Sequence, residues 1–539
     1  MAYDQSKILQ AMRQPEFYPH PVSHLHQCET HISTVFLTGS FVYKIKKPVN
    51  LGFLDFTTLE QRRHFCEREV MLNRRLSRDV YLEVVPITRQ PSGYQFRGPG
   101  HPVEYAVKMR QLAEDDGMIE RLKRSAVTDD DIDDLARRLV SFYRETATVA
   151  KNGMIDERPD AVPPWQENFD VLRPFVGRYL DRTAFDAIET ATHHFFKSRR
   201  PLFQRRIDGG KIKDCHGDLR SDHIYFTPDG IQIIDCIEFN DRFRYQDIIS
   251  DLAFLAMDLE DQGFIETARA IIRQYVERTS DVASLPLLDF YRCYRAMVRC
   301  KVSCVRASQM TPNALAHDNP QAAAGRYLAM AHGYAVAFGR RAIWIVFGLP
   351  ASGKSTVAAE LGRILGIEVL RSDVIRKKLF SKAGEGGGST PFGKGLYTHT
   401  ATAATYEEMF AQAVDGLDRD GGVLLDATFA DADRRSEAIA LARRNSAMPI
   451  LVECKASDSV LATRLRERET QPSLSDARLH HLDEFKKKFQ PYASSEGGIH
   501  MIANTATPLP LSVQRIMLTY IVDGTLQNRS GDDIKADGP

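Results

Sequence analysis

The residues Gly348 to Ser355 read Gly-Leu-Pro-Ala-Ser-Gly-Lys-Ser, a pattern that could bind the phosphates of a nucleoside triphosphate. An apolar run, 343–347, precedes them, and a segment with helical periodicity follows. Glycines let successive backbone N–H groups wrap around phosphate oxygens, while Lys354 reaches the β and γ oxygens and Ser355 holds Mg²⁺. The sequence therefore predicts a P-loop with ATP and Mg²⁺ as cofactors. The predicted ATP-binding residues are Gly348, Leu349, Pro350, Ala351, Ser352, Gly353, Lys354, Ser355 and Thr356, and Ser355 is also a predicted metal ligand.

A carboxylate ends the next apolar run, because Asp373 follows the stretch 367–370. Ligands of open α/β sheets bind at the carboxyl ends of the strands. We therefore expect Asp373 to act as the catalytic base that accepts a proton from a substrate hydroxyl, with a helix N-cap as its alternative role.

A second constellation lies in the N-terminal half, where His216-Gly-Asp218 is followed about seventeen residues later by Ile233-Ile-Asp235. Two separated carboxylates are what a phosphoryl-transfer site needs. We expect Asp218 to orient the attacking hydroxyl as the catalytic residue and Asp235 to hold Mg²⁺.

The elements that position these residues fall into two patterns. After about residue 335, apolar runs alternate with helical patterns, which is typical of a parallel sheet covered on both faces. These runs are 343–347, 367–370, 423–425, 449–453 and 500–503. In the N-terminal part of the chain, a hairpin at 33–45 and a helical stretch at 62–76 precede longer helical patterns such as 131–149. This order predicts a small β lobe followed by a larger helical lobe.

The predicted domains are therefore 1–335, 336–526 and a disordered polar tail at 527–539. A glycine-dense stretch, Gly384 to Thr390, lies between two strands of the second domain. It is either a mobile substrate loop or a slack connection.

The N-terminal half, over roughly residues 20 to 305, resembles aminoglycoside phosphotransferases and choline-kinase-like enzymes, which are relatives of protein kinases. The resemblance implies that Asp218 is the catalytic base and Asp235 the metal-binding aspartate. It further implies that Lys44 is the strand lysine that touches the α and β phosphates, with Lys46 as the alternative, and that Glu69 is its helix partner.

One position departs from that resemblance. The family has asparagine five residues after the catalytic aspartate, and this chain has His223. His223 is thus the residue at the second metal position, although hard cations prefer oxygen ligands over imidazole. The second metal is then absent, altered or held otherwise, and a pseudokinase stays open as an alternative.

The C-terminal half resembles the small P-loop kinases of the gluconate kinase, polynucleotide kinase and zeta-toxin type. The resemblance implies that Asp426, which ends the run 423–425, orients Mg²⁺, and that Arg434 or Arg435 steadies substrate or phosphate. Arg464 and Arg468 fit a lid that closes over the triphosphate as part of the ATP site, and a solvated basic face is the competing interpretation.

The predicted fold class is therefore an α+β, protein-kinase-like bilobal domain followed by an α/β P-loop domain with a doubly wound parallel sheet. Such a chain resembles bacterial fusions of a phosphotransferase-like domain with a P-loop ATPase or kinase domain.

Composition narrows the partners. The 539 residues carry 71 basic and 71 acidic side chains, which argues against long nucleic acids. No apolar run approaches the length of a membrane span, and the N-terminus lacks a secretory signal pattern, so we expect a cytoplasmic protein without a membrane partner. The eight cysteines form no C-x-x-C pair and are expected to be reduced and structural.

The leading hypothesis is a protein in which each half transfers the γ-phosphoryl group of Mg-ATP to a hydroxyl of a small molecule. The alternatives are an N-terminal ligand-sensing pseudokinase that regulates a C-terminal kinase, and a C-terminal nucleic-acid or nucleotide-sugar kinase. The acceptor and the oligomeric state stay open.

Overall fold

The structure is a computed structural model that describes residues 5–52, 54–91, 93–149, 163–310, 319–380, 398–469 and 478–524. The chain forms two compact units, and each is built from two stretches of sequence. The first unit comprises Met1–Glu167 and Ile207–Arg278, and the second comprises Asn168–Arg206 and Thr279–Pro539.

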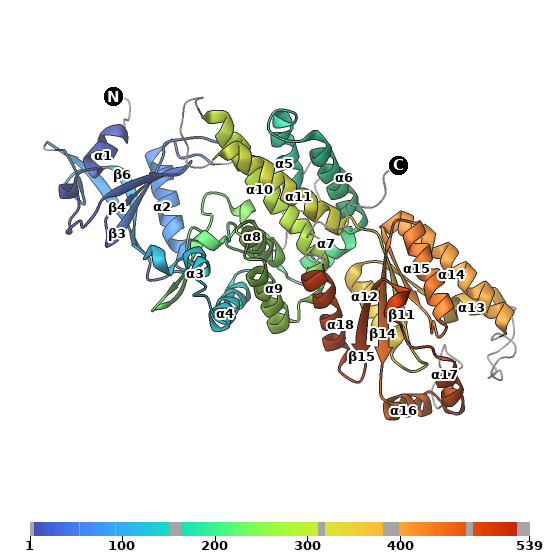
Figure 1. The fold of residues 1–539 in the computed structure, drawn as a ribbon. Coiled ribbons are helices and arrows are strands. Elements are labelled where there is room, and N and C mark those ends of the chain that lie inside the picture. Colours follow the sequence, from blue (N-terminus) through green and yellow to red (C-terminus); the bar gives the residue numbers. More distant parts are fainter. Residues whose placement is uncertain are drawn as a thin grey trace. The chain divides into compact units, whose positions relative to one another are not determined.

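The first unit begins with a six-stranded antiparallel sheet (Figure 1). Its strands are β1 (His26–Glu29), β2 (Ser33–Leu37), β3 (Phe41–Lys46), β4 (Tyr81–Gln90), β5 (Gly93–Phe96) and β6 (Pro102–Arg110). They lie in the order β1-β2-β3-β6-β4-β5. Helix α1 (Gln5–Met12) packs on one face, and helix α2 (Leu59–Asn73), which starts at a capping box, packs on the other.

Strand β3 places two lysines on the face that α2 covers. Side chains of a strand alternate between the two faces of its sheet. Tyr43 and Ile45 join the core beside α1, whereas Val42 joins the core under α2. Lys44 and Lys46 share the face of Val42, so both extend toward α2.

The rest of the first unit is mainly helical. It contains α3 (Met118–Lys123), α4 (Asp129–Glu145), α8 (Ile248–Asp261) and α9 (Ile265–Thr279), with the short strands β7 (Ile212–Asp214), β8 (Ile224–Thr227), β9 (Gly230–Ile233) and β10 (Tyr245–Asp247). Strands β8 and β9 form an antiparallel hairpin, and β7 pairs with β10. A β lobe followed by a helical lobe confirms the predicted bilobal α+β fold.

The second unit contains a group of helices and a parallel sheet. Helices α6 (Arg182–Ser198), α10 (Leu288–Gln309) and α11 (Pro320–Phe338) pack together, and α5 (Pro164–Leu172) and α7 (Arg200–Asp208) cross the limits between the units. The predicted domains placed these helices with the β lobe, so the compact units and the predicted domains differ. The domain boundaries stay a prediction.

The parallel sheet has five strands in the order β12-β13-β11-β14-β15. They are β11 (Ala342–Phe347), β12 (Glu368–Arg371), β13 (Gly422–Asp426), β14 (Met448–Lys455) and β15 (Ile499–Asn504), and all their pairings are parallel.

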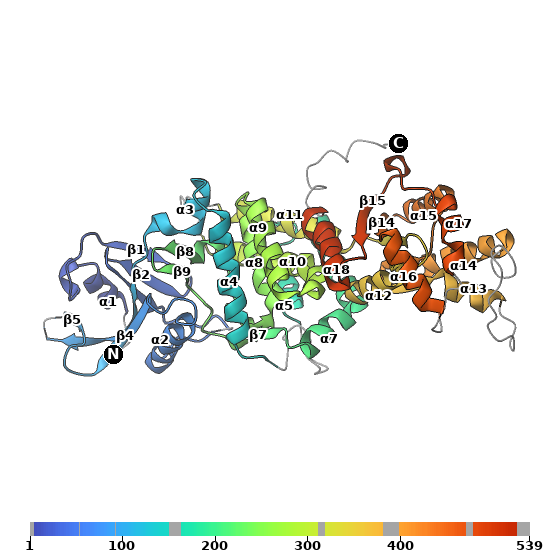
Figure 2. The ribbon, with the colours of Figure 1, turned by 90° about the horizontal axis from the view of Figure 1, so that it is seen from below.

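Helices cover both faces of this sheet, as Figure 2 shows from a second direction. The helices α12 (Lys354–Leu365) and α18 (Leu509–Met517) pack on one face, and α14 (His399–Asp420) and α15 (Ala432–Arg444) pack on the other. The domain is completed by α13 (Ser372–Phe380), α16 (Asp458–Glu469) and α17 (Leu482–Lys488). The predicted doubly wound fold is therefore confirmed.

Two predictions lie outside the described residues, namely the glycine-dense stretch Gly384 to Thr390 and the tail at 527–539. Among the described helices, none combines the length and the apolar run that a bilayer crossing requires. All eight cysteines are free thiols, and all but Cys28 are buried, as a structural role requires.

The core of the parallel sheet offers a stability test. We expect Ile345→Ala to lower the free energy of unfolding of this domain by about 2–5 kcal/mol, because Ile345 is fully buried in the central strand β11. The control Ile502→Ala lies in β15 of the same sheet, is 55% exposed, and should change stability by less than about 0.5 kcal/mol. Urea unfolding followed by Trp344 fluorescence, in a Trp165→Phe background, measures both. Equal losses would contradict this assignment of the core.

Candidate functional site

The P-loop joins β11 to α12 at the carboxyl end of the central strand. Gly348 has a φ of 147°, and a Cβ there would lie 2.5 Å from the carbonyl oxygen of Cys454. Gly353 has a φ of 84° and precedes the first residue of α12, Lys354. Side chains at these two positions would be strained, so glycine is required for the turn itself. The N-terminus of α12 faces the loop, and the partial positive charge at this end of the helix favours an anion.

Asp426, the predicted Mg²⁺ ligand, lies beside the P-loop. It ends β13, which pairs directly with β11, and only 3% of the residue is exposed. Its Oδ1 is buried without a hydrogen-bond partner among the described residues, while Arg371 Nε donates to Oδ2 at 3.2 Å. Burial raises the pKa of Asp426, and the positive charges of Lys354 and Arg371 and a hydrogen bond from Ser355 oppose that rise. An unsatisfied carboxylate oxygen next to a serine hydroxyl fits Mg²⁺, which prefers oxygen ligands.

Asp373 lies in the first turn of α13, just after β12. Its Oδ1 accepts from Arg376 Nη1 at 3.2 Å. Because β12 pairs with β13, Asp373 and Asp426 lie at the carboxyl ends of neighbouring strands. The structure thus brings together the predicted base, the predicted metal ligand and the P-loop at one edge of the sheet, and their roles stay predictions.

Arg464 of α16 lies against the P-loop. Its Nη1 donates to Ala351 O and to Thr505 Oγ1, both at 3.2 Å, and its Nη2 donates to Thr505 O at 2.6 Å. Thr505 in turn donates to Ser352 O at 2.6 Å. Thr505, which sequence reasoning missed, and Arg464 therefore fix the backbone of the loop. The side chain of Arg468 lies outside the described part of the chain.

The sequence offered Arg434 or Arg435 as the arginine that steadies substrate or phosphate, and the structure places Arg435 in the core of the domain. Arg435 is fully buried, and its Nε and Nη2 form a two-pronged ion pair with Glu496 at 2.8 and 2.7 Å. Its remaining donors reach the carbonyl oxygens of Phe429, Gln490 and Pro491. These bonds satisfy the guanidinium, which holds the loop after α17 against the sheet. Arg434 pairs with Glu437 at 2.7 Å on the same helix.

The first unit gathers a lysine and two acids under its β lobe. Lys44 Nζ lies 2.9 Å from Glu69 Oε1 and 2.6 Å from Asp235 Oδ1. Burial lowers the pKa of Lys44, but the charges of Asp235 and Glu69 raise it by more, so the lysine stays charged. Asp235 has a φ of 65°, a strained conformation for a residue with a side chain, and such strain is typical of functional positions.

Lys46 occupies a different position from Lys44. It is fully buried and pairs with Glu69 Oε2 at 2.7 Å and with Glu238. Lys44 is the lysine that contacts Asp235, whereas Lys46 pairs with Glu69 and Glu238 in the core. Of the two sequence candidates, the geometry favours Lys44 as the lysine that would meet phosphate.

The loop that carries Asp218 is held by two buried acids that sequence reasoning missed. Asp251 accepts hydrogen bonds from the backbone N–H groups of His216 and Gly217 at 2.9 and 3.0 Å, and from Tyr143 Oη at 3.1 Å. Asp258 accepts from the N–H of Ser221 at 2.9 Å. Both acids lie on α8 within the run 248–259, which is apolar apart from them and Ser250, and a carboxylate in such a run was the available signal.

Asp218 itself stays open to solvent, with 29% of its side chain exposed. Arg220 Nε lies 3.3 Å from each of its carboxylate oxygens. His223 is buried, and its Nδ1 lies 3.0 Å from the backbone oxygen of Asp218, while its Nε2 lies 3.7 Å from Asp235 Oδ2. The four predicted residues Lys44, Asp218, His223 and Asp235 therefore form one cluster.

Neither cluster is a closed metal site. Among the described residues, no three His, Cys, Asp or Glu side chains are arranged to hold a metal ion by themselves. Mg²⁺ is commonly bound by one or two carboxylates together with substrate phosphates and water. Metal at either place would therefore arrive with a nucleotide.

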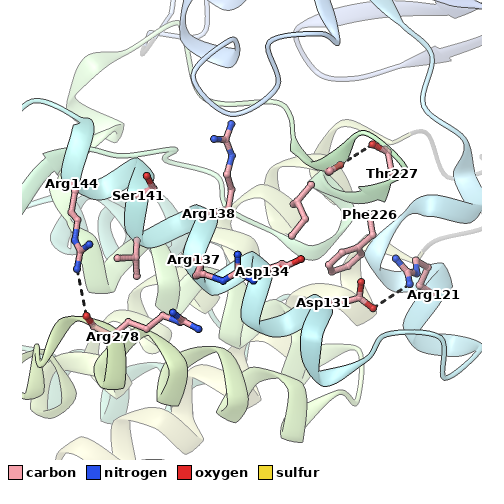
Figure 3. Close-up of a pocket in the computed structure, with 13 residues that line it drawn as sticks. Arg121, Asp131, Asp134, Arg137, Arg138, Ser141, Arg144, Phe226, Thr227 and Arg278 are labelled. Atoms are coloured by element: carbon pink, nitrogen blue, oxygen red, sulfur yellow. Dashed lines mark hydrogen bonds and ion pairs between the residues drawn. The ribbon is translucent and has the colours of Figure 1, made fainter.

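A hollow of about 810 Å³ in the first unit is lined by none of these residues (Figure 3). Helix α4 and the β8–β9 hairpin provide most of its wall. Three of its five arginines are paired with carboxylates of α4, since Arg121 contacts Asp131, and Arg137 and Arg278 contact Asp133. The hollow contains structural ion pairs and lacks a nucleophile–base arrangement.

The fold defines the class of the protein: a bilobal α+β part is followed by a doubly wound α/β domain that carries a P-loop. Residues 343–492 match a family model described as an AAA domain. Over 443 residues the chain is 33% identical to uncharacterized proteins of Mycobacterium tuberculosis (strain ATCC 25618 / H37Rv) and Mycobacterium bovis (strain ATCC BAA-935 / AF2122/97), covering 82% of this chain and 85% of each relative. The chain belongs to the family of these mycobacterial proteins.

Two solved structures are similar to separate parts of the chain. A choline/ethanolamine kinase family protein from Mesorhizobium loti is 14% identical, covers 62% of this chain and 99% of its own, and has a TM-score of 0.39. A gluconokinase from Sinorhizobium meliloti 1021 is 16% identical, covers 35% of this chain and 97% of its own, and has a TM-score of 0.25.

The ion pair of Arg435 predicts a large effect on stability. We expect Arg435→Met to destabilise the P-loop domain by about 3–5 kcal/mol, because it leaves Glu496 buried without its partner. The neighbouring Arg434→Met breaks a pair within one helix and should cost about 1 kcal/mol or less. Urea unfolding monitored by Trp344 compares the two. A stable Arg435→Met protein with impaired nucleotide binding would restore the original prediction.

His216 predicts a dependence of stability on pH. Burial lowers its pKa from 6.5 to about 4. In the unfolded chain His216 therefore binds a proton below about pH 6.5, whereas in the folded protein it binds one only below about pH 4. Stability of the first unit should fall as pH decreases through this window, by at most about 1.4 kcal/mol per pH unit from this group.

Urea unfolding between pH 4 and 7, followed by Trp165 in a Trp344→Phe background, measures this slope. His216→Gln should flatten it, and the exposed His64→Gln should leave it unchanged. An unchanged slope in His216→Gln would show that other groups cause the acid sensitivity.

Proposed function

We propose that the chain is an ATP-dependent phosphotransferase with two nucleotide-binding sites, each of which transfers the γ-phosphoryl group of Mg-ATP to a hydroxyl of a small molecule. One observation carries the proposal: each half holds a lysine beside one carboxylate suited to metal and another suited to proton transfer. The N-terminal set is Lys44, Asp235 and Asp218, and the C-terminal set is Lys354, Asp426 and Asp373.

In the N-terminal site, the acceptor hydroxyl would attack the γ-phosphorus while the bond to the β–γ bridging oxygen breaks. Asp218 is open to solvent and can accept the hydroxyl proton. Asp235 would exchange part of its contact with Lys44 for Mg²⁺, and Lys44 would then meet phosphate oxygens. The bound metal would supply charge neutralisation on the phosphates.

In the C-terminal site, the backbone of the P-loop would cradle the phosphates while Ser355 and Asp426 hold Mg²⁺. Asp373 would accept the proton of the second acceptor. Its contact with Arg376 holds the carboxylate near the edge of the sheet. Specificity would come from the glycine-dense stretch Gly384 to Thr390 if, of its two interpretations, it is the substrate loop.

A pseudokinase in the N-terminal half is the second candidate, and one observation favours it. His223 stands at the second metal position and its Nε2 is engaged by Arg220 at 2.9 Å. A nucleic-acid kinase in the C-terminal half is the third, and salt-dependent retention on single-stranded DNA or RNA would favour it.

Turnover tests the proposal. We expect ATP consumption with a panel of amino sugars, choline and gluconate to reveal at least one acceptor for each half. Asp218→Asn should lower kcat for one acceptor by about 10²–10⁴-fold, and Asp373→Asn should do so for another, because each removes a proton acceptor.

Two exposed aspartates serve as controls, Asp229→Asn in the first unit and Asp418→Asn in the second. Neither should change turnover. Asp218→Asn without effect on any acceptor would contradict a kinase in the N-terminal half and favour the pseudokinase.

A further inference from the structure

Both ring nitrogens of His223 are engaged in hydrogen bonds, so neither is available to bind a metal. Arg220 Nη2 lies 2.9 Å from Nε2, and arginine can only donate, so Nε2 accepts this bond. The other nitrogen, Nδ1, lies 3.0 Å from the backbone oxygen of Asp218 and donates to it. A neutral imidazole has one lone pair on nitrogen, and here Arg220 occupies it.

Arg220 places a permanent positive charge beside the catalytic loop. Its Nε lies 3.3 Å from the Asp218 carboxylate, its Nη1 lies 2.9 Å from Asp222 Oδ2, and only 14% of its side chain is exposed. Burial lowers the pKa of Arg220, but the charges of Asp218 and Asp222 raise it by more. The residues at the expected second metal position therefore do not fit a second divalent cation.

We propose that the guanidinium of Arg220 takes the place of a second metal ion in the N-terminal site, which binds a single metal ion through Asp235. This inference rests on the proposed function, because the metal enters with a nucleotide. The geometry supports it in two ways. First, the guanidinium of Arg220 belongs to the same loop as Asp218, the proposed base. Second, the same side chain contacts both carboxylate oxygens of Asp218 and donates a hydrogen bond to Nε2 of His223, which leaves that nitrogen no lone pair for a metal.

Metal counting tests the inference without using turnover. The full-length protein with Lys354→Ala in the P-loop is saturated with a non-hydrolysable ATP analogue, and bound Mn²⁺ is counted by electron paramagnetic resonance. We expect one Mn²⁺ per bound nucleotide with the native loop. With Arg220→Met and His223→Asn together, an amide oxygen becomes available and the competing cation is gone, so the count should rise to two.

The control Arg110→Met removes another arginine of the first unit, one that pairs with the exposed Asp229, and should leave the count at one. Two Mn²⁺ with the native loop would overturn the inference. A count that stays at one in the double variant would overturn the part assigned to Arg220 and His223. Calorimetry on the same samples measures whether the Lys354→Ala protein binds the nucleotide at all. If it binds none, both the proposed N-terminal kinase and this inference are refuted.

Discussion

A charge cannot be buried alone, and this constraint governs both halves of the molecule. Under the β lobe, Lys44 and Lys46 are taken out of water together with Glu69, Glu238 and Asp235. Because Glu69 contacts both lysines, it joins α2 to β3 by charge as well as by apolar packing. Binding of a nucleotide would exchange Asp235 for phosphate beside Lys44, so the ion pair keeps the lysine in place until phosphate replaces the acid.

The same constraint shapes the loops that carry the predicted bases. Asp251 is buried, and it is satisfied by backbone N–H groups of the loop before Asp218. In the P-loop domain, Arg435 fixes a loop through Glu496, whereas Asp426 keeps one oxygen unsatisfied beside the phosphate-binding turn. Paired charges therefore build the frame of each site, and the proposed Mg²⁺ would satisfy the remaining oxygen of Asp426.

Much of this architecture could be predicted from local patterns. The P-loop, the doubly wound sheet and the bilobal fold follow from glycine spacing, apolar runs and their periodicity, which are properties of neighbouring residues. The role of Arg435 could not be predicted, because its burial depends on Glu496, 61 residues away, and on a loop packed from a different element. Thr505 and Asp251 were missed for the same reason: each acts on a backbone that is distant in sequence. The choice between Lys44 and Lys46 needed the position of Asp235, although the alternation of the strand had already placed both lysines on one face.

The central claim is that both halves bind nucleotide, and the number of Mg-ATP sites tests it most directly. Calorimetric titration of the intact protein, of Lys354→Ala and of Asp235→Ala counts these sites. The account predicts two sites in the intact protein, with each variant losing a different one. A single site, lost in Lys354→Ala and unaffected by Asp235→Ala, would contradict it.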